Sequence, residues 1–219
     1  MFCSALVAGA VMFTACEGGD GEGMSDEITA VVTSINAAVS DVPEDVKVVK
    51  LATRDWVNGD GNYVLITLTP AGTFSGGKIN IDLTGIVPPL SMMGGVDYGE
   101  RVSDKNAKIA FIEGLAAFDA SGENHLGWFR YGDVGYNFEE WACFVYADRD
   151  VDIHGEVSSG EGAGGERFID SWGARFKKGW NFLTISTSID DNTTRTQYST
   201  RICEHSFSWS FEPKFPVSE

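Results

Sequence analysis

Short apolar runs alternate with short, glycine-rich polar runs along most of the chain. Three runs in the first half alternate apolar and polar residues or are apolar throughout: VKVVKLAT (46–53), YVLITLT (63–69) and KINIDL (78–83). The segments between them, NGDGN (58–62) and AGTFSGG (71–77), are rich in Asn-Gly, Asp-Gly and other glycine pairs that favour tight turns. The pattern therefore predicts antiparallel strands joined by hairpins.

The second half repeats the pattern after residues 88–100, a stretch rich in Pro and Gly that predicts the longest loop and a candidate boundary between two small β units. The later apolar runs are AKIAFIEGLAAFDA, HLGWFRY, WACFVYAD, VDIHGEV, RFIDSWGARF, WNFLTISTS, TQYSTRI and HSFSWSF. None has a strong helical period. In Ser25–Val39 the apolar residues fall at helical spacing, but the many β-branched residues favour a strand.

These patterns predict an all-β fold with few or no helices. The chain has 219 residues, of which 43% are hydrophobic, and this is enough for a sizeable core. Its 26 glycines suit many short strands joined by turns better than a few long helices. We expect an antiparallel β-sandwich, immunoglobulin-like or transthyretin-like, over residues 27–219.

The first residues form a different kind of segment. The apolar run ALVAGAVMFTA leads directly to Cys16, and the residues EGGDGEG follow. The run has the length of the hydrophobic part of a secretory signal and is too short to span a membrane, which takes about 20 residues. Residues 1–15 therefore resemble a bacterial lipoprotein signal, with acyl chains on Cys16 and a flexible acidic tether over residues 16–26. The alternative is that residues 1–15 form a buried strand or helix.

The chain is strongly acidic, with 16 Lys and Arg against 32 Asp and Glu and a net charge of −16. Residues 1–15 carry no charged side chain, so the whole charge belongs to the chain after them. Such a chain repels nucleic acids and other polyanions. The composition therefore argues against a nucleic-acid partner.

Several motifs of the second half carry a resemblance to a known group of proteins. They are VSDKNAKIA (102–110), VYADRDVDIHG (145–155), KKGWN (177–181) and the closing pair Trp209 and Phe211. Together with the acidic residues after Cys16, they resemble surface-exposed Bacteroidetes-type lipoproteins. The resemblance implies a β-rich domain that lipid holds at the outer membrane, exposed on the cell surface. It implies no activity and no functional residue.

Two cysteines lie in apolar runs of the second half, Cys143 in WACFVY and Cys203 in RICEHSF. In an oxidising compartment such a pair can form a disulfide. The alternative is that both are buried free thiols, because Cys is often a core residue. The sequence leaves both interpretations open.

Three carboxylates alternate along ADRDVD: Asp148, Asp150 and Asp152. Carboxylates that lie close together can hold a hard cation such as Ca²⁺. In a strand, however, a rise of about 3.3 Å per residue spreads them along one face, and the segment lacks the glycine of an EF-hand loop. We favour a solvated strand face or turn here, and expect no metal ion and no cofactor.

Aromatic residues gather in HLGWFRYGDVGYNFEEW, residues 125–141. Side chains alternate between the faces of a strand, so Trp128 and Arg130 share one face while Phe129 and Tyr131 share the other, and we expect at most one set to be buried. The exposed set could form a stacking surface for sugar rings. The ligand-binding candidates are Trp128, Arg130, Tyr131, Tyr136 and Trp141. The alternative is that one set is core and the other a cross-strand aromatic pair without function.

These observations favour binding over catalysis, because no nucleophile, metal or phosphate motif stands above background. The first hypothesis is a non-enzymatic, lipid-anchored surface module that binds neutral glycans. The second is an adhesin or envelope assembly subunit that contacts a protein partner, which an exposed, uncharged edge strand would favour. The third is a hydrolase, which two facing carboxylates in a cleft would favour.

Overall fold

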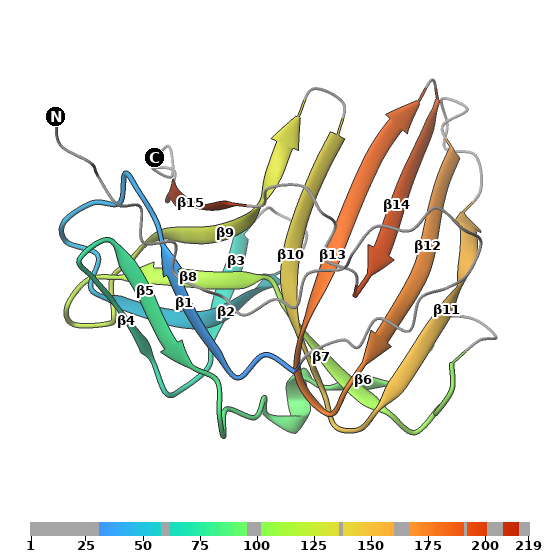
Figure 1. Ribbon diagram of the computed structural model, residues 1–219, viewed down its shortest axis with the longest axis horizontal. Coiled ribbons are helices and arrows are strands. Elements are labelled where there is room, and N and C mark those ends of the chain that lie inside the picture. The colour runs from blue at the N-terminus through green and yellow to red at the C-terminus, as the bar shows by residue number, and fades with distance from the viewer. Residues whose placement is uncertain are drawn as a thin grey trace, which may run out of the picture.

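The computed structural model describes residues 31–57, 62–95, 102–135, 138–159, 167–190, 192–200 and 208–214. These residues form 15 strands and one short 3-10 helix, and they contain no α-helix (Figure 1). The elements are β1 (Ser34–Ala38), β2 (Val48–Val57), β3 (Asn62–Thr67), β4 (Gly72–Ser75), β5 (Lys78–Asp82), η1 (Leu90–Met92), β6 (Gly94–Gly95), β7 (Lys108–Ile112), β8 (Gly114–Phe118), β9 (His125–Gly135), β10 (Phe138–Ala147), β11 (Val151–Ser159), β12 (Arg167–Phe176), β13 (Gly179–Asp190), β14 (Thr193–Ser199) and β15 (Ser208–Pro213).

All the strands belong to one open, mixed sheet. Its main path runs β1-β5-β4-β2-β8-β9-β10-β13-β14-β12-β11, while β15 pairs with β9, β3 with β2, and β7 with both β10 and β6. Every pair is antiparallel except β12 with β14. The all-β, mostly antiparallel prediction is confirmed. The pairing does not show the two separate sheets of the predicted sandwich, because β2, β8 and β9 connect the two halves of the chain.

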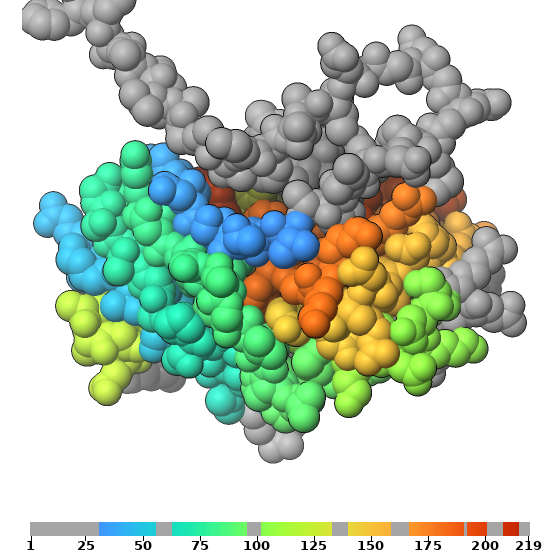
Figure 2. Space-filling view, turned by 60° about the horizontal axis from the view of Figure 1, so that its bottom comes forward, coloured from blue at the N-terminus to red at the C-terminus, as the bar shows by residue number. Residues whose placement is uncertain are grey.

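The first half of the sheet curls around the larger core. Strands β1 and β5 alternate exposed and buried residues, as their sequences predict, and their buried side chains pack in one cluster with those of β8, β9, β10 and β13. Residues 31–33 lead into β1 beside β13, where the Val32 amide donates to the Trp180 carbonyl at 2.8 Å (Figure 2). Trp180 itself is buried, and its indole N–H donates to the Ile86 carbonyl at 2.8 Å.

A second core lies under the other half of the sheet. Buried residues from β7, β10, β11, β12 and β13 form it, among them Ile109, Val145, Ile153, Phe176 and Leu183. Strands β10 to β14 are the long strands on the right of Figure 1, and they extend well beyond β6 and β7. On these strands, three partly exposed residues, Trp172, Ile185 and Tyr198, pack against the second core.

Two local predictions need correction. AGTFSGG was expected to be a turn, but Gly72–Ser75 forms β4, and the turn is confined to Gly76 and Gly77, which adopt φ of 56° and 73°. A Cβ at Gly72 would lie 2.5 Å from the Asn80 carbonyl oxygen, so this glycine allows β4 and β5 to approach closely. The described part of the expected loop over residues 88–100 contains η1 and the two-residue strand β6.

Candidate functional site

The predicted aromatic region forms β9 and the start of β10, and it is not a single platform. Trp128 is 6% exposed and packs with Ala52, Ala116 and Phe118, while the Arg54 guanidinium lies 4.9 Å from its ring centroid. Phe129, on the opposite face of β9, is 1% exposed. The expectation that one face at most is buried is therefore wrong at this pair, because packed side chains cover both faces of β9 here.

The other predicted residues separate onto two faces. Tyr131 stacks on Trp209 of β15, with ring centroids 5.1 Å apart. In the register of β9 and β10, Tyr131 is opposite Ala142 and Gly132 is opposite Trp141, so Tyr131 and Trp141 point to opposite sides of the sheet. Trp141 thus shares a face with Trp128 and Arg130. Tyr136 lies outside the described residues.

Arg130 on β9 and Arg54 on β2 each form an ion pair. The Nε of Arg130 lies 2.6 Å from Oε2 of Glu212 on β15, and Nε of Arg54 lies 3.3 Å from Oε2 of Glu113. Burial raises the pKa of the Glu113 carboxyl, and the nearby Arg54 and Arg130 partly offset that increase. The Arg130–Glu212 pair joins β9 to β15, and the Arg54–Glu113 pair joins β2 to the residue between β7 and β8, so these charges are already paired.

Further along the face of the sheet that carries Trp128 and Trp141, a row of side chains has the properties that a stacking surface needs. The cross-strand registers place Trp141 of β10 opposite Ile185 of β13, Ile185 opposite Tyr198 of β14, and Tyr198 opposite Trp172 of β12. All four side chains lie in one row, and all four are partly exposed. The rings of Trp172 and Tyr198 are stacked, with centroids 4.0 Å apart and planes 5° from parallel. We call the part of the sheet around this row the Trp172 face.

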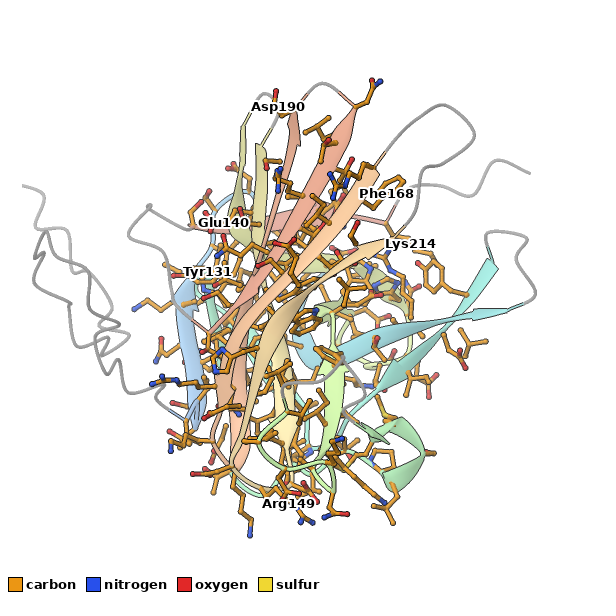
Figure 3. All side chains as sticks on the ribbon, turned by 90° about the vertical axis from the view of Figure 1, so that its right-hand side faces the viewer. Tyr131, Glu140, Arg149, Phe168, Asp190 and Lys214 are labelled. Carbon is orange, nitrogen blue, oxygen red and sulfur yellow. The ribbon has the colours of Figure 1, made fainter. Side chains whose placement is uncertain are left out.

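Large apolar side chains continue this face towards the outer ends of the strands. Ile189 on β13 is 60% exposed, Phe168 on β12 is 40% exposed and Val157 on β11 is 46% exposed. Each of them lies an even number of residues along its strand from the row of Trp172, so its side chain points to the same face. Figure 3 shows Phe168 and Asp190 near the end of the strands that lies opposite Arg149. Exposed apolar groups that gather on one face mark an interaction surface more often than scattered ones do.

Hydrogen-bonding groups lie between these apolar residues. Thr187, Thr196 and Asp170 are opposite one another in the registers of β13, β14 and β12, and all three are partly exposed. The cross-strand neighbour of Trp172 on β11 is Gly155, and a Cβ at Gly155 would meet nothing within 4 Å. Gly155 therefore contributes no side chain beside Trp172, and the ring of Phe111 on β7 packs edge-on against Trp172, with centroids 6.4 Å apart.

Sequence reasoning missed the Trp172 face because its central contact joins strands that are not neighbours along the chain. Trp172 lies in RFIDSWGARF and Tyr198 in TQYSTRI, and the whole of β13 separates them. The pairing that stacks them is the parallel one, which no turn or alternation signal predicts. The sequence contains the two aromatic residues but does not indicate that β12 and β14 pair with Trp172 opposite Tyr198.

Two of the three alternating aspartates, Asp148 and Asp150, bond to backbone amides near turns. Asp148 accepts a hydrogen bond from the Lys108 amide at 2.9 Å, and Asp150 accepts one from the Lys178 amide at 2.9 Å. These hydrogen bonds, together with those to Arg149 and Lys177, lower the pKa of both carboxyls. Among the described residues no group of His, Cys, Asp or Glu could hold a metal ion.

These contacts bring together three of the motifs that carry the sequence resemblance. VSDKNAKIA contributes Asp104, VYADRDVDIHG contributes Arg149, whose guanidinium lies 3.4 Å from Asp104, and KKGWN contributes Lys177, which pairs with Asp150 at 3.0 Å. Asp152 lies on β11, and its amide donates to the Ser103 hydroxyl. The motifs therefore meet at one end of the sheet, where they fix the connections between strands.

Cys143 is a free, buried thiol on β10, and Cys203 lies outside the described residues, as does Cys16. Burial raises the pKa of the Cys143 thiol from 9.0 to about 12, and the Glu113 carboxylate adds to the increase. No described helix is long and apolar enough to cross a membrane.

The raised pKa of Cys143 predicts a loss of stability in alkali. The unfolded thiol ionises near pH 9 and the folded one near pH 12, so the stabilisation is complete below pH 9 and is lost as the pH rises towards 12. Urea unfolding between pH 8 and pH 11 should therefore show a steeper decline in the free energy of unfolding for the wild type than for Cys143→Ala. Parallel declines in the two proteins would contradict the assignment.

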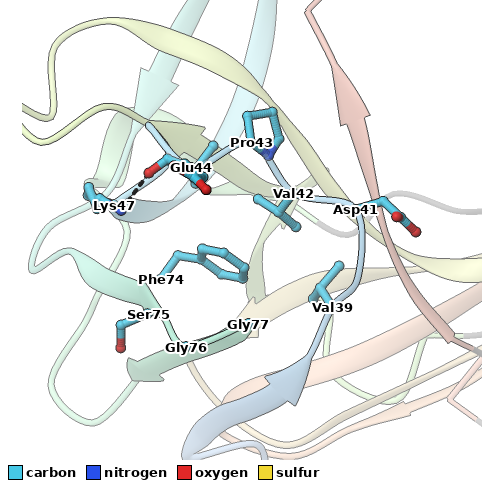
Figure 4. Close-up of a pocket in the computed structure, with 11 residues that line it drawn as sticks. Val39, Asp41, Val42, Pro43, Glu44, Lys47, Phe74, Ser75, Gly76 and Gly77 are labelled. Carbon is cyan, nitrogen blue, oxygen red and sulfur yellow. Dashed lines mark hydrogen bonds between the residues drawn. The ribbon is translucent and has the colours of Figure 1, made fainter.

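A depression in the described surface lies elsewhere, between the loop after β1 and the β4–β5 hairpin. Its volume is about 390 Å³, and Val39, Val42 and Phe74 provide its apolar lining (Figure 4). The Lys47 ammonium at its rim donates to the Glu44 carbonyl. Asp41 and Glu44 also line the depression, which lies away from the Trp172 face.

Comparisons with known proteins identify no relative: no family model, no curated protein and no solved structure matches the chain. The resemblance to Bacteroidetes-type lipoproteins therefore remains a prediction, and the structure supports its β-rich part alone.

Proposed function

We propose that the protein is a non-enzymatic binding module that takes neutral glycans on its Trp172 face. The observation that carries the proposal is the stacked pair of Trp172 and Tyr198, which lies beside the polar row of Asp170, Thr196 and Thr187 on a partly exposed strand surface. Sugar rings present C–H groups that pack on aromatic rings, and their hydroxyls bond to carboxylates and hydroxyls. Here the aromatic rings of Trp172 and Tyr198 lie one row away from the carboxylate and hydroxyl groups of Asp170, Thr196 and Thr187 on the same face.

The net charge favours a neutral ligand, and the proposal is of binding rather than hydrolysis. A chain of net charge −16 disfavours sulfated or phosphorylated polymers. Glycoside hydrolysis generally needs two carboxyl groups about 5–10 Å apart. The registers continue the row of Asp170, Thr196 and Thr187 to Glu139 on β10, and Asp170 is the carboxylate of this row whose side chain the structure describes.

The location is part of the same proposal. Acyl chains on Cys16 would hold the domain at the outer membrane through the tether of residues 16–26, as in Bacteroidetes-type surface lipoproteins. Several acyl chains on one residue make such an anchor durable. Support comes from the order of an apolar run, a small-residue pair, Cys16 and an acidic, glycine-rich segment. We further propose that the curled sheet works as a sandwich, with β1, β4 and β5 as one layer.

A glycan array with matched variants tests the binding proposal. Trp172→Ala removes a partly exposed indole stacked on a tyrosine of the Trp172 face, and Trp209→Ala removes an equivalent indole stacked on Tyr131 of the opposite face. We expect neutral glycans to bind the wild type and Trp209→Ala, and Trp172→Ala to lose about tenfold or more in affinity, as for a central aromatic contact.

Asp170→Asn provides a second variant that keeps the aromatic pair intact. It should weaken binding while circular dichroism remains that of the wild type, because it changes one hydrogen-bonding group without removing volume. Equal binding by all the variants, or no binding of any neutral glycan by the wild type, would contradict the proposal.

A further inference from the structure

Strand β3 is an uncharged edge of the sheet. Among the described strands it pairs with β2 alone. Its sequence, NYVLIT, contains no Lys, Arg, Asp, Glu or Pro, the residues that natural edge strands use to prevent pairing with another chain. Val64 at its centre is 56% exposed. The outer edge of β3 therefore presents backbone hydrogen-bonding groups without the usual protection.

The hairpin that carries this edge projects from the rest of the sheet. Beyond Ala52, β2 no longer pairs with β8, and β3 is its partner up to Val57. Figure 3 shows the two strands, in pale cyan, extending away from the body of the molecule. At the base of the hairpin the Arg54 guanidinium lies 5.3 Å from the Tyr63 ring and 4.9 Å from the Trp128 ring. These contacts hold the hairpin in place, so β3 would lose little conformational entropy when a partner strand pairs with it.

The residues of β3 are nearly symmetrical about Leu65. When the strand is written against a second copy in antiparallel direction, Leu65 is opposite Leu65, Val64 is opposite Ile66, and Tyr63 is opposite Thr67. Each opposite pair shares a face and combines apolar, β-branched or aromatic residues, which are the favourable cross-strand pairs. A two-fold axis at Leu65 satisfies the same-patch symmetry that closed dimers require.

We propose that β3 is a dimerisation edge, on which a second copy of this chain pairs antiparallel about Leu65 and continues the sheet across a two-fold axis. The inference is independent of the glycan proposal, because β3 belongs to a different part of the sheet from the Trp172 face.

Charge gives the dimer a distinctive dependence on salt. Each copy carries a net charge of −16, and the pairing strands themselves are uncharged, so long-range repulsion opposes the dimer while local contacts favour it. Salt shortens the screening length from about 10 Å at 0.1 M to about 3 Å at 1 M. The affinity of the dimer should therefore increase as salt is added. Binding to a basic partner would instead weaken as salt is added.

Sedimentation equilibrium of the chain carrying Cys16→Ser, which cannot be acylated, tests the proposal. We expect a monomer–dimer equilibrium that shifts towards dimer between 0.1 M and 1 M NaCl. Hydrogen exchange should show protection of residues 62–67 that increases with protein concentration. A monomer at all salt and protein concentrations, with exchange in β3 independent of concentration, would overturn the proposal.

A matched pair of variants tests whether β3 forms the dimer contact. Val64→Lys places a charge on β3, and Val87→Lys places one at a valine of similar exposure, 59%, outside the strands. Both reduce the net negative charge equally, so general repulsion falls by the same amount in each. We expect Val64→Lys to weaken dimerisation about tenfold or more and Val87→Lys to leave it unchanged or slightly stronger. Equal effects of the two variants would place the dimer contact elsewhere and overturn the assignment to β3.

Discussion

Replacing Asn181 by Ala should reduce the free energy of unfolding by about 3–5 kcal/mol, because the buried amide satisfies backbone groups of the turn before β13. Asn181 has no exposed surface. Its Oδ1 accepts from the Lys177 amide at 2.9 Å, and its Nδ2 donates to the carbonyls of Lys177 and Gly179 at 2.8 and 2.9 Å. Alanine would leave a backbone donor and two acceptors without these partners.

The expected loss is a large part of the stability of an ordinary domain, about 5–15 kcal/mol. Urea or guanidinium unfolding measures it. Asn80→Ala is the control, since Asn80 lies on β5 with an exposed side chain, and it should change the free energy of unfolding by about 0.5 kcal/mol or less. If Asn181→Ala were as mild as Asn80→Ala, the turn would not depend on the buried amide.

Gly127→Ala should be the second strongly destabilising substitution, by about 1–3 kcal/mol or more, and should loosen β15 from β9. A Cβ at Gly127 would lie 2.4 Å from the Glu212 carbonyl oxygen and 2.7 Å from the Phe211 ring. Gly127 is opposite Pro213 in the β9–β15 register, so the clash falls on the backbone of the paired strand, which cannot move without losing its hydrogen bonds.

Gly173→Ala is the matched control, because Gly173 also lies within a strand but a Cβ there would meet nothing within 4 Å. It should be neutral or slightly stabilising, since alanine restricts the unfolded chain. Unfolding curves, together with hydrogen exchange of residues 208–213, compare the two variants. Equal stability of the two would show that β15 does not approach β9 as closely as the structure has it.

Local features of the fold could be predicted, because they depend on neighbours along the chain. The alternation of Ile79 and Ile81 with polar residues in β5, and the burial of Trp180 after the Lys177–Lys178 turn, follow from patterns within a few residues. The all-β class follows from the same patterns repeated. None of them indicates which strands outside a hairpin lie side by side.

The candidate site could not be predicted for that reason. Trp128 was expected to be a ligand platform, yet its burial depends on packing against Ala52 of β2 and on Arg54, more than 70 positions earlier in the chain. No local pattern marks Trp172 as a ligand contact. Its position beside Tyr198 depends on the parallel register of β12 and β14. The burial of Trp128 and the stacking of Trp172 on Tyr198 both depend on contacts between residues far apart in the sequence.

Mapping a bound saccharide onto the backbone tests whether the Trp172 face binds neutral glycans. Amide chemical shifts of the isotope-labelled protein would be followed while a neutral oligosaccharide selected on the array is added. We expect saturable shifts at Asp170, Trp172, Thr196 and Tyr198, and none around Tyr131 and Trp209. Shifts confined to the Tyr131 and Trp209 side, or no shifts at all, would contradict the proposal.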